Sequence, residues 1–80
     1  MRITETSKKT GASTDEIRYF EAKGYITPER LRIRTREVRE YSNEDIRMIE
    51  TLIKYRREGF ELGTAYEKAM HEVQQPYLIG

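Results

Sequence analysis

The chain has 80 residues, which is room for one domain and no more, and it carries a formal net charge of +1. Apolar and charged residues each make up 36% of the sequence, and no apolar run is long enough to span a membrane. Cysteine is absent, which excludes a disulfide framework and thiolate metal sites, and with no signal peptide this predicts a cytoplasmic protein.

Positive charge is concentrated in the first half of the chain. Residues 1–41 contain ten Lys and Arg against seven Asp and Glu, whereas residues 42–80 contain five against seven. Five arginines fall within ten residues, namely Arg30, Arg32, Arg34, Arg36 and Arg39. A local cluster of this kind indicates a surface for a polyanion more strongly than the whole-chain charge does.

Two short helices are predicted near the N-terminus. The first covers residues 4–10, with Thr4 as its N-cap and Gly11 in the left-handed position after its end. The second covers about residues 13–23 and opens with a capping-box pattern at residues 13–16. Two helices joined by a short turn that contains glycine predict a helix-turn-helix unit.

Residues 30–41 are expected to form a two-stranded hairpin. Arginines alternate there with Leu31 and Ile33, which is the period of a strand, and we place the turn near Arg36 and Glu37. The same alternation predicts that four arginines share one strand face, namely Arg30, Arg32, Arg34 and Arg36. Such a row could follow a phosphate backbone, or it could be a solvated face that protects a sheet edge.

Two further helices are predicted after the hairpin. The third follows the N-cap Ser42 and ends near Gly59, and the fourth covers about residues 63–74. The expected core comprises Ile17, Phe20, Tyr25, Ile26, Ile46, Ile49, Leu52, Ile53, Phe60 and Leu62. The fold class is therefore mainly α, a winged helix-turn-helix with four helices and a β-hairpin wing between the second and third. One domain is expected over residues 1–75, with a short tail at 76–80.

Motifs in a fixed order support this fold. They are Gly11-Ala12-Ser13, Ile17-Arg18-Tyr19-Phe20-Glu21, Gly24-Tyr25-Ile26-x-Pro28, Arg39-x-Tyr41-Ser42-x-Glu44-Asp45-Ile46 and Gly59-Phe60-x-Leu62. Over residues 2–73 the chain resembles the DNA-binding domain of the mercury-resistance regulator (MerR) family. The resemblance implies sequence-specific binding of double-stranded DNA by a transcription regulator, either a repressor or an activator, with a palindromic site and two protomers.

The chain departs from the family pattern in the wing and at its end. The family usually carries Gly and Tyr before the wing arginine, where this chain has Glu37 and Val38. Members typically continue into a long dimerising helix and an effector domain, so we expect either a compact relative or an excised N-terminal domain. No site for a small-molecule effector is expected within these residues.

The second helix is expected to enter the major groove of DNA, as the recognition helix of a helix-turn-helix does. Its candidate contacts are Thr14, Asp15, Arg18 and Tyr19. Arg18 could pair with guanine or a phosphate, Thr14 could touch a thymine methyl group, and Asp15 could accept from a cytosine amino group. Ser13 and Glu16 are interpreted as helix caps.

The wing and the first helix supply the remaining candidates. In the wing these are Arg32, Arg34, Arg36, Arg39 and Tyr41, on adjacent backbone or in the minor groove. Arg39 matches the family's wing motif and is the first choice, whereas Tyr41 is equally suited to the core beneath the wing. Lys9 could contact the backbone where the first helix crosses it, or lie on a solvated face.

Enzymatic chemistry is not predicted. His71 is the only histidine, so a metal site or catalytic base built on it is disfavoured, and no cofactor is expected. Two other functions remain open beside the regulator. One is a protein-interaction module that uses the polar first helix and the apolar tail at residues 77–79, and the other is an excisionase-like architectural DNA binder.

Overall fold

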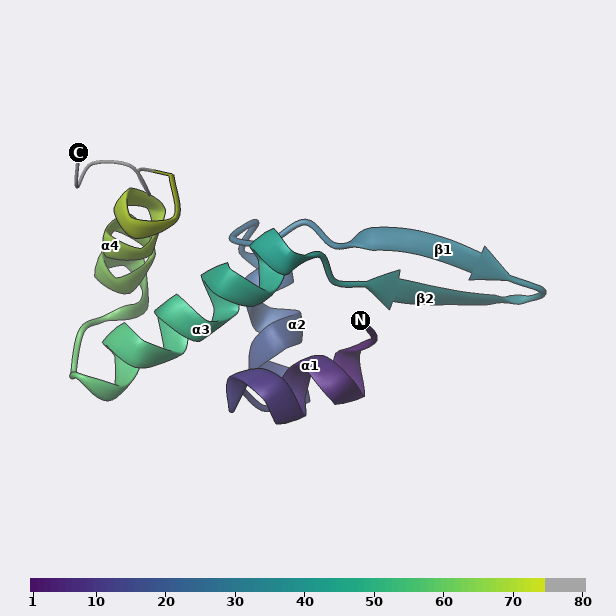
Figure 1. Ribbon diagram of the computed structural model, residues 1–80, viewed down its shortest axis with the longest axis horizontal. Helices are drawn as coiled ribbons and strands as arrows, with labels where there is room; N and C mark the ends of the chain where they lie inside the picture. Colours follow the sequence, from purple (N-terminus) through teal and green to yellow (C-terminus); the bar gives the residue numbers. More distant parts are fainter. Residues whose placement is uncertain (75–80) are drawn as a thin grey trace.

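Four helices and one β-hairpin make up residues 1–74, the part of the chain that the computed structural model describes (Figure 1). In chain order these are α1 (Ile3–Thr10), α2 (Thr14–Ala22), β1 (Glu29–Ile33), β2 (Arg36–Glu40), α3 (Asn43–Arg57) and α4 (Leu62–Gln74). This arrangement confirms the predicted winged helix-turn-helix, with the wing between α2 and α3. The domain boundary at residue 75 and the tail at 76–80 lie outside the described residues.

The α1–α2 unit is closed by the turn chemistry expected from the sequence. Gly11 has a φ of 83°, a left-handed conformation that glycine adopts without a steric penalty, and its N–H donates to the Ser7 carbonyl. Ser13 and Glu16 form a reciprocal capping box at the start of α2. The two helices are therefore joined by a short turn, and the backbone N–H groups of Gly11 and Ser13 have hydrogen-bond partners in the helices on either side.

The start of α1 differs from the prediction that Thr4 is its N-cap. The helix begins at Ile3, with Arg2 as the N-cap and without a capping side chain. The Arg2 carbonyl accepts both the backbone N–H and the side-chain hydroxyl of Thr6, at 2.9 and 2.8 Å. The helix extends one residue further because Tyr41 donates its N–H to the Met1 carbonyl at 2.7 Å, a tertiary contact that fixes residue 1.

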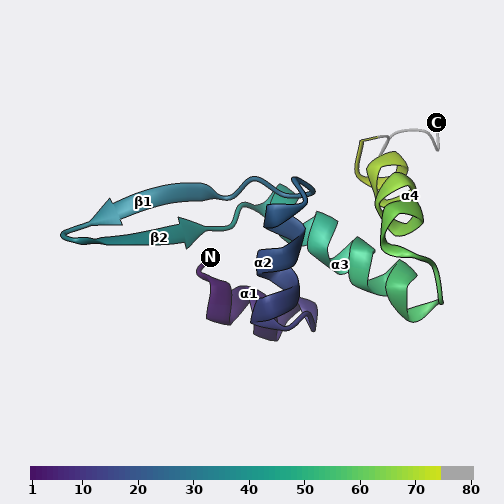
Figure 2. The same cartoon turned by 180° about the vertical axis from the view of Figure 1, so that it is seen from behind.

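The wing, which we define as β1, β2 and their connecting loop, is an antiparallel hairpin that projects away from the helices in both views (Figures 1 and 2). Its turn lies at Arg34 and Thr35, so the predicted position near Arg36 and Glu37 is wrong by two residues. Arg34 takes a φ of 57°, a conformation usually left to glycine or asparagine. Pattern reading missed the turn because its sequence contains neither residue.

The strand register separates the wing into two faces. Arg30 pairs with Arg39 and Leu31 pairs with Val38, and cross-strand partners lie on the same face. We call one of them the basic face of the wing, and its members are Arg30, Arg32, Glu37 and Arg39. The expected row of four arginines is therefore wrong, because Arg34 is in the turn and Arg36 lies on the opposite face.

Helix α3 forms the centre of the core. Ile49 and Leu52 of α3 and Ile17 of α2 have no exposed surface, and α4 packs on α3 through the fully buried Ala65 and Ala69. Of the expected core residues, most are buried, while Tyr25, Phe60 and Leu62 are partly buried at its edge. Helix α2 thus shares one core with α3 and α4 through Ile17. None of the helices within residues 1–74 has the length and apolar character needed to cross a membrane.

Candidate nucleic-acid interface

Helix α2 presents polar side chains on the face that points away from the core. Ile17 and Phe20 are buried in the core, which turns the intervening residues outwards. The side chains of Arg18 and Asp15 are 63% and 96% exposed, and they meet only in a long ion pair of 3.5 Å. Tyr19 is 52% exposed. Three of the four predicted contacts on this helix are therefore open to solvent, and Thr14 is partly exposed.

The outer part of the wing is rich in unpaired positive charge. Arg32, Arg34 and Arg36 are exposed, and no carboxylate within residues 1–74 forms an ion pair with any of them. They do not share one face, since Arg32 is on the basic face, Arg34 is in the turn and Arg36 is on the far side. The tip of the wing is therefore positive all round rather than along one row.

Arg39, near the base of the wing, has a different environment. Its Nε atom donates to Glu21 of α2 at 3.0 Å, and its Nη1 atom donates to Glu37 at 3.0 Å. The hydrogen bond to Glu21 raises the pKa of Arg39 above its usual value, and Glu37 adds to the effect. Arg30 also approaches Glu21, at 3.6 Å. Glu21 therefore ties α2 to both strands of the wing.

A groove runs between α2 and the base of the wing. Arg18, Arg30 and Arg39 line it, together with the carboxylate of Glu21. Its remaining lining residues, including Pro28, come from the end of α2 and the connection to β1. The predicted contacts Arg18 and Arg39 are thus brought together although they are 21 positions apart in the sequence. Such a groove, cationic and open, can accept an extended polyanion.

Tyr41 does not lie on this surface. Its side chain is only 2% exposed and lies within the core beneath the wing, so Tyr41 is not exposed for a contact with DNA. Burial raises the pKa of its hydroxyl, and the charge of Glu21 raises it further. The core role that the sequence left open for Tyr41 is the one that fits its position.

Lys9 is exposed in the last turn of α1, as a backbone contact would require. The turn beside it is also approached by Arg57, whose Nη2 atom donates to the Gly11 carbonyl at 3.4 Å. A Cβ atom at Gly11 would lie 3.1 Å from that Nη2 atom. The turn between α1 and α2 is therefore contacted by Arg57 at the C-terminal end of α3.

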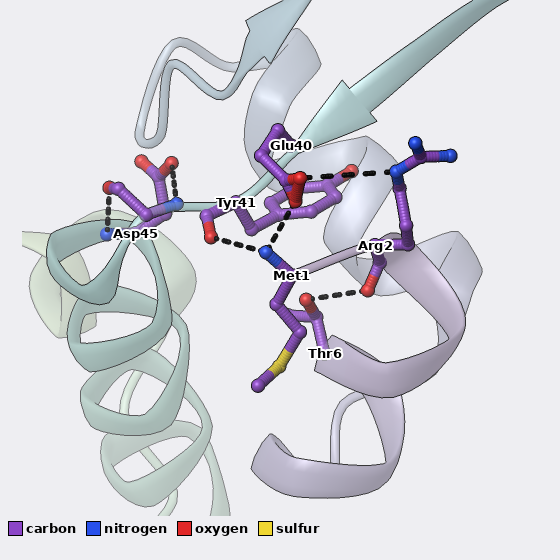
Figure 3. A network of polar contacts seen from close by, with 7 residues as sticks. Met1, Arg2, Thr6, Glu40, Tyr41 and Asp45 are labelled. Carbon is purple, nitrogen blue, oxygen red and sulfur yellow. Dashed lines mark hydrogen bonds and ion pairs between the residues drawn. The ribbon is translucent and has the colours of Figure 1, made fainter.

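The base of the wing is also joined to the start of α1 (Figure 3). The amino group of Met1 forms an ion pair with Glu40 and donates to the Tyr41 carbonyl at 3.2 Å. This ion pair lowers the pKa of the Glu40 carboxyl. The charge of Arg2, whose Nε atom lies 3.9 Å from that carboxyl, lowers the pKa further. The wing thus has two polar attachments, one to α2 through Glu21 and one to residues 1–2.

Sequence reasoning assigned no role to Glu21 or Glu37. For Glu37 a signal was present, because residues two apart on a strand share a face and Glu37 stands two before Arg39. For Glu21 there was none, since its contact with Arg39 joins elements 18 residues apart. Among residues 1–74, no group of three or more His, Asp or Glu side chains is placed to hold a metal ion.

Comparison with known protein families identifies a family model that covers most of the chain. The family model described as MerR HTH family regulatory protein matches residues 1–70. No curated protein sequence matches the chain. The matched region includes α1, α2, the wing and α3, and with them every element of the surface described above.

Proposed function

Because the chain belongs to the MerR family of helix-turn-helix regulatory proteins, we propose that it binds specific sites on double-stranded DNA and regulates transcription. The observation that carries the finer proposal is the groove in which Arg18 of α2 meets Arg30 and Arg39 of the wing. A recognition helix and an arginine-rich hairpin beside one groove can hold a base edge and the neighbouring backbone together.

In this proposal α2 enters the major groove. Arg18 pairs with guanine or clamps a phosphate, since its planar guanidinium suits both. Thr14 and Asp15, at the start of the helix, reach a thymine methyl group and a cytosine amino group. The open ion pair between Arg18 and Asp15 supports these roles, because an exposed pair of this length is readily separated.

The wing contacts adjacent backbone or the minor groove in the same proposal. Arg32, Arg34 and Arg36 serve as phosphate contacts, since no carboxylate within residues 1–74 neutralises them. Lys9 adds a contact where α1 crosses the backbone. With few base contacts for one molecule, we propose that two protomers, or one protomer and a partner protein, occupy a palindromic site.

The test uses fluorescence anisotropy with duplex DNA over a series of salt concentrations. We expect saturable binding to random-sequence duplex that weakens linearly on a log–log plot against salt. The Arg32→Ala variant should weaken binding to every duplex and reduce the salt slope by about 1. Arg47→Ala is the matched control, because Arg47 is an exposed arginine on α3, outside α2 and the wing.

Base recognition is tested separately, on a site selected from random duplexes. There Arg18→Ala should cost about 1–3 kcal/mol of binding free energy and relax the preference at one position of the site. If Arg18→Ala and Arg32→Ala bind as well as Arg47→Ala, the proposed surface is wrong. If the wild-type chain binds no duplex even at low salt, the DNA-binding proposal for this chain is itself overturned.

A further inference from the structure

Glu37 is an acidic side chain on the basic face of the wing. Its cross-strand neighbour is Arg32, and its carboxylate accepts a hydrogen bond from Nη1 of Arg39 at 3.0 Å. The Glu37 side chain is 51% exposed. A negative charge therefore lies between Arg39 and Arg32, the second of which we have assigned to a DNA phosphate.

Arg39 is held by two carboxylates of unequal exposure. Glu21 accepts from Nε and is 19% exposed, whereas Glu37 accepts from Nη1 and is far more exposed. Guanidinium groups bind phosphate best through two parallel N–H groups. Because Glu21 holds Nε, the pair left for a phosphate is Nη1 and Nη2, where the phosphate meets the carboxylate on Nη1. That carboxylate belongs to Glu37, whose exposed position lets water solvate it readily once it leaves Arg39.

We propose that Glu37 occupies, in the free protein, the position on Arg39 that a backbone phosphate takes in the DNA complex. Binding then exchanges a carboxylate for a phosphate, while Glu21 continues to hold Arg39 against α2. This inference rests on the proposed function. Because phosphates are common to all sequences, Glu37 lowers the affinity for every duplex by the same factor and leaves the preference between sequences unchanged.

The experiment replaces Glu37 with glutamine and measures duplex binding by anisotropy at a fixed, low salt concentration. The amide keeps the size of the side chain but has no charge to hold Arg39 or to repel phosphate. We expect Glu37→Gln to bind roughly three- to fivefold more tightly than the wild type, as the loss of one exposed ion pair allows. The gain should be equal for a random duplex and for a selected site.

Two controls separate a direct exchange from a general change in charge. Glu29→Gln removes the same charge from an exposed position on the opposite face of the same hairpin. Its affinity should stay within about twofold of the wild type, since screening weakens the field of a charge that makes no contact. In an Arg39→Gln background, Glu37→Gln should give no gain beyond that of Glu29→Gln, because the group that it releases is gone.

The outcomes distinguish this inference from the proposed function. Wild-type binding with a gain specific to Glu37→Gln, abolished by Arg39→Gln, supports the exchange. Wild-type binding with unchanged or weaker binding by Glu37→Gln overturns it, as does an equal gain in Glu29→Gln, and both leave the proposed function intact. Absence of binding by the wild type and by every variant overturns both.

Discussion

The hydroxyl of Tyr41 lies among buried side chains beneath the wing, and no group within residues 1–74 forms a hydrogen bond with it. A buried hydroxyl without a partner has lost its hydration without compensation. We therefore expect Tyr41→Phe to raise the free energy of unfolding by about 1 kcal/mol. Urea denaturation followed by circular dichroism measures the change.

Tyr19→Phe is the matched control for that substitution. It removes a hydroxyl from a tyrosine that is 52% exposed, so the free energy of unfolding should change by less than about 0.5 kcal/mol. A loss of about 1 kcal/mol in Tyr41→Phe would show instead that the hydroxyl has a partner in solution, such as a bound water.

Single residues at the candidate site were predictable where local spacing determines exposure. Arg18 and Tyr19 face outwards because Ile17 and Phe20 set the buried face of α2. The partners of Arg39 were not predictable in the same way, because Glu21 reaches it from another element. Tyr41 stands two positions after Arg39, a spacing that puts two side chains on one face of a continuous strand. However, β2 ends at Glu40 and the chain turns into the core before α3.

Among the elements, the wing holds the least favourable local conformation of the described backbone. Within residues 1–74, Arg34 is the one residue other than glycine with a positive φ, and an L-residue with a side chain is strained in that conformation. Glycine adopts this conformation freely, so Arg34→Gly should raise the free energy of unfolding by up to about 1 kcal/mol. Thermal denaturation measures it, and hydrogen exchange of the hairpin amides localises it.

The neighbouring loop residue supplies the control for the turn. Thr35 has no positive φ, so Thr35→Gly should lower the stability by about 0.5–1 kcal/mol through the added freedom of the unfolded chain. If both glycine variants destabilise the protein equally, the left-handed conformation of Arg34 does not exist in solution. DNA binding by Arg34→Gly should still weaken, because the variant loses one cation of the wing.

Helix boundaries were predictable to within about two residues, because capping chemistry is local. Ser13 and Ser42 cap α2 and α3 through reciprocal bonds with Glu16 and Asp45, as their spacing indicates. The start of α1 and the turn of the wing were not predictable. In the first case a tertiary bond from Tyr41 sets the boundary, and in the second an arginine takes a conformation that its residue type disfavours.

For the whole molecule, acid stability depends on carboxylates that have partners in the folded state. The hydrogen bond from the Tyr55 hydroxyl lowers the pKa of Glu72, and Lys54 lowers it further from 3.2 Å. Because the folded pKa lies below the ordinary 4.5 of the unfolded chain, this contribution is present above pH 4.5. It is lost as the pH falls through the folded pKa.

The Glu72→Gln variant tests this contribution. Above pH 4.5 it should be less stable than the wild type, by no more than about 1 kcal/mol because the pair is exposed to solvent. The difference should shrink as the pH falls through the folded pKa of Glu72, where the wild-type carboxyl also becomes protonated. Urea unfolding at a series of pH values measures it, with Glu67→Gln on the exposed face of α4 as control. A difference that does not vary with pH would contradict the assignment.

The two faces of the wing also limit how the strands of relatives of this protein can change in length. Strand side chains alternate between faces, so inserting or deleting a single residue within one strand exchanges the faces beyond that point. Arg39 would then turn away from Glu21, and an apolar neighbour such as Val38 would take its place beside α2. Lineages that keep the link between helix and hairpin should therefore vary by substitution, and change the length of a strand only in steps of two residues.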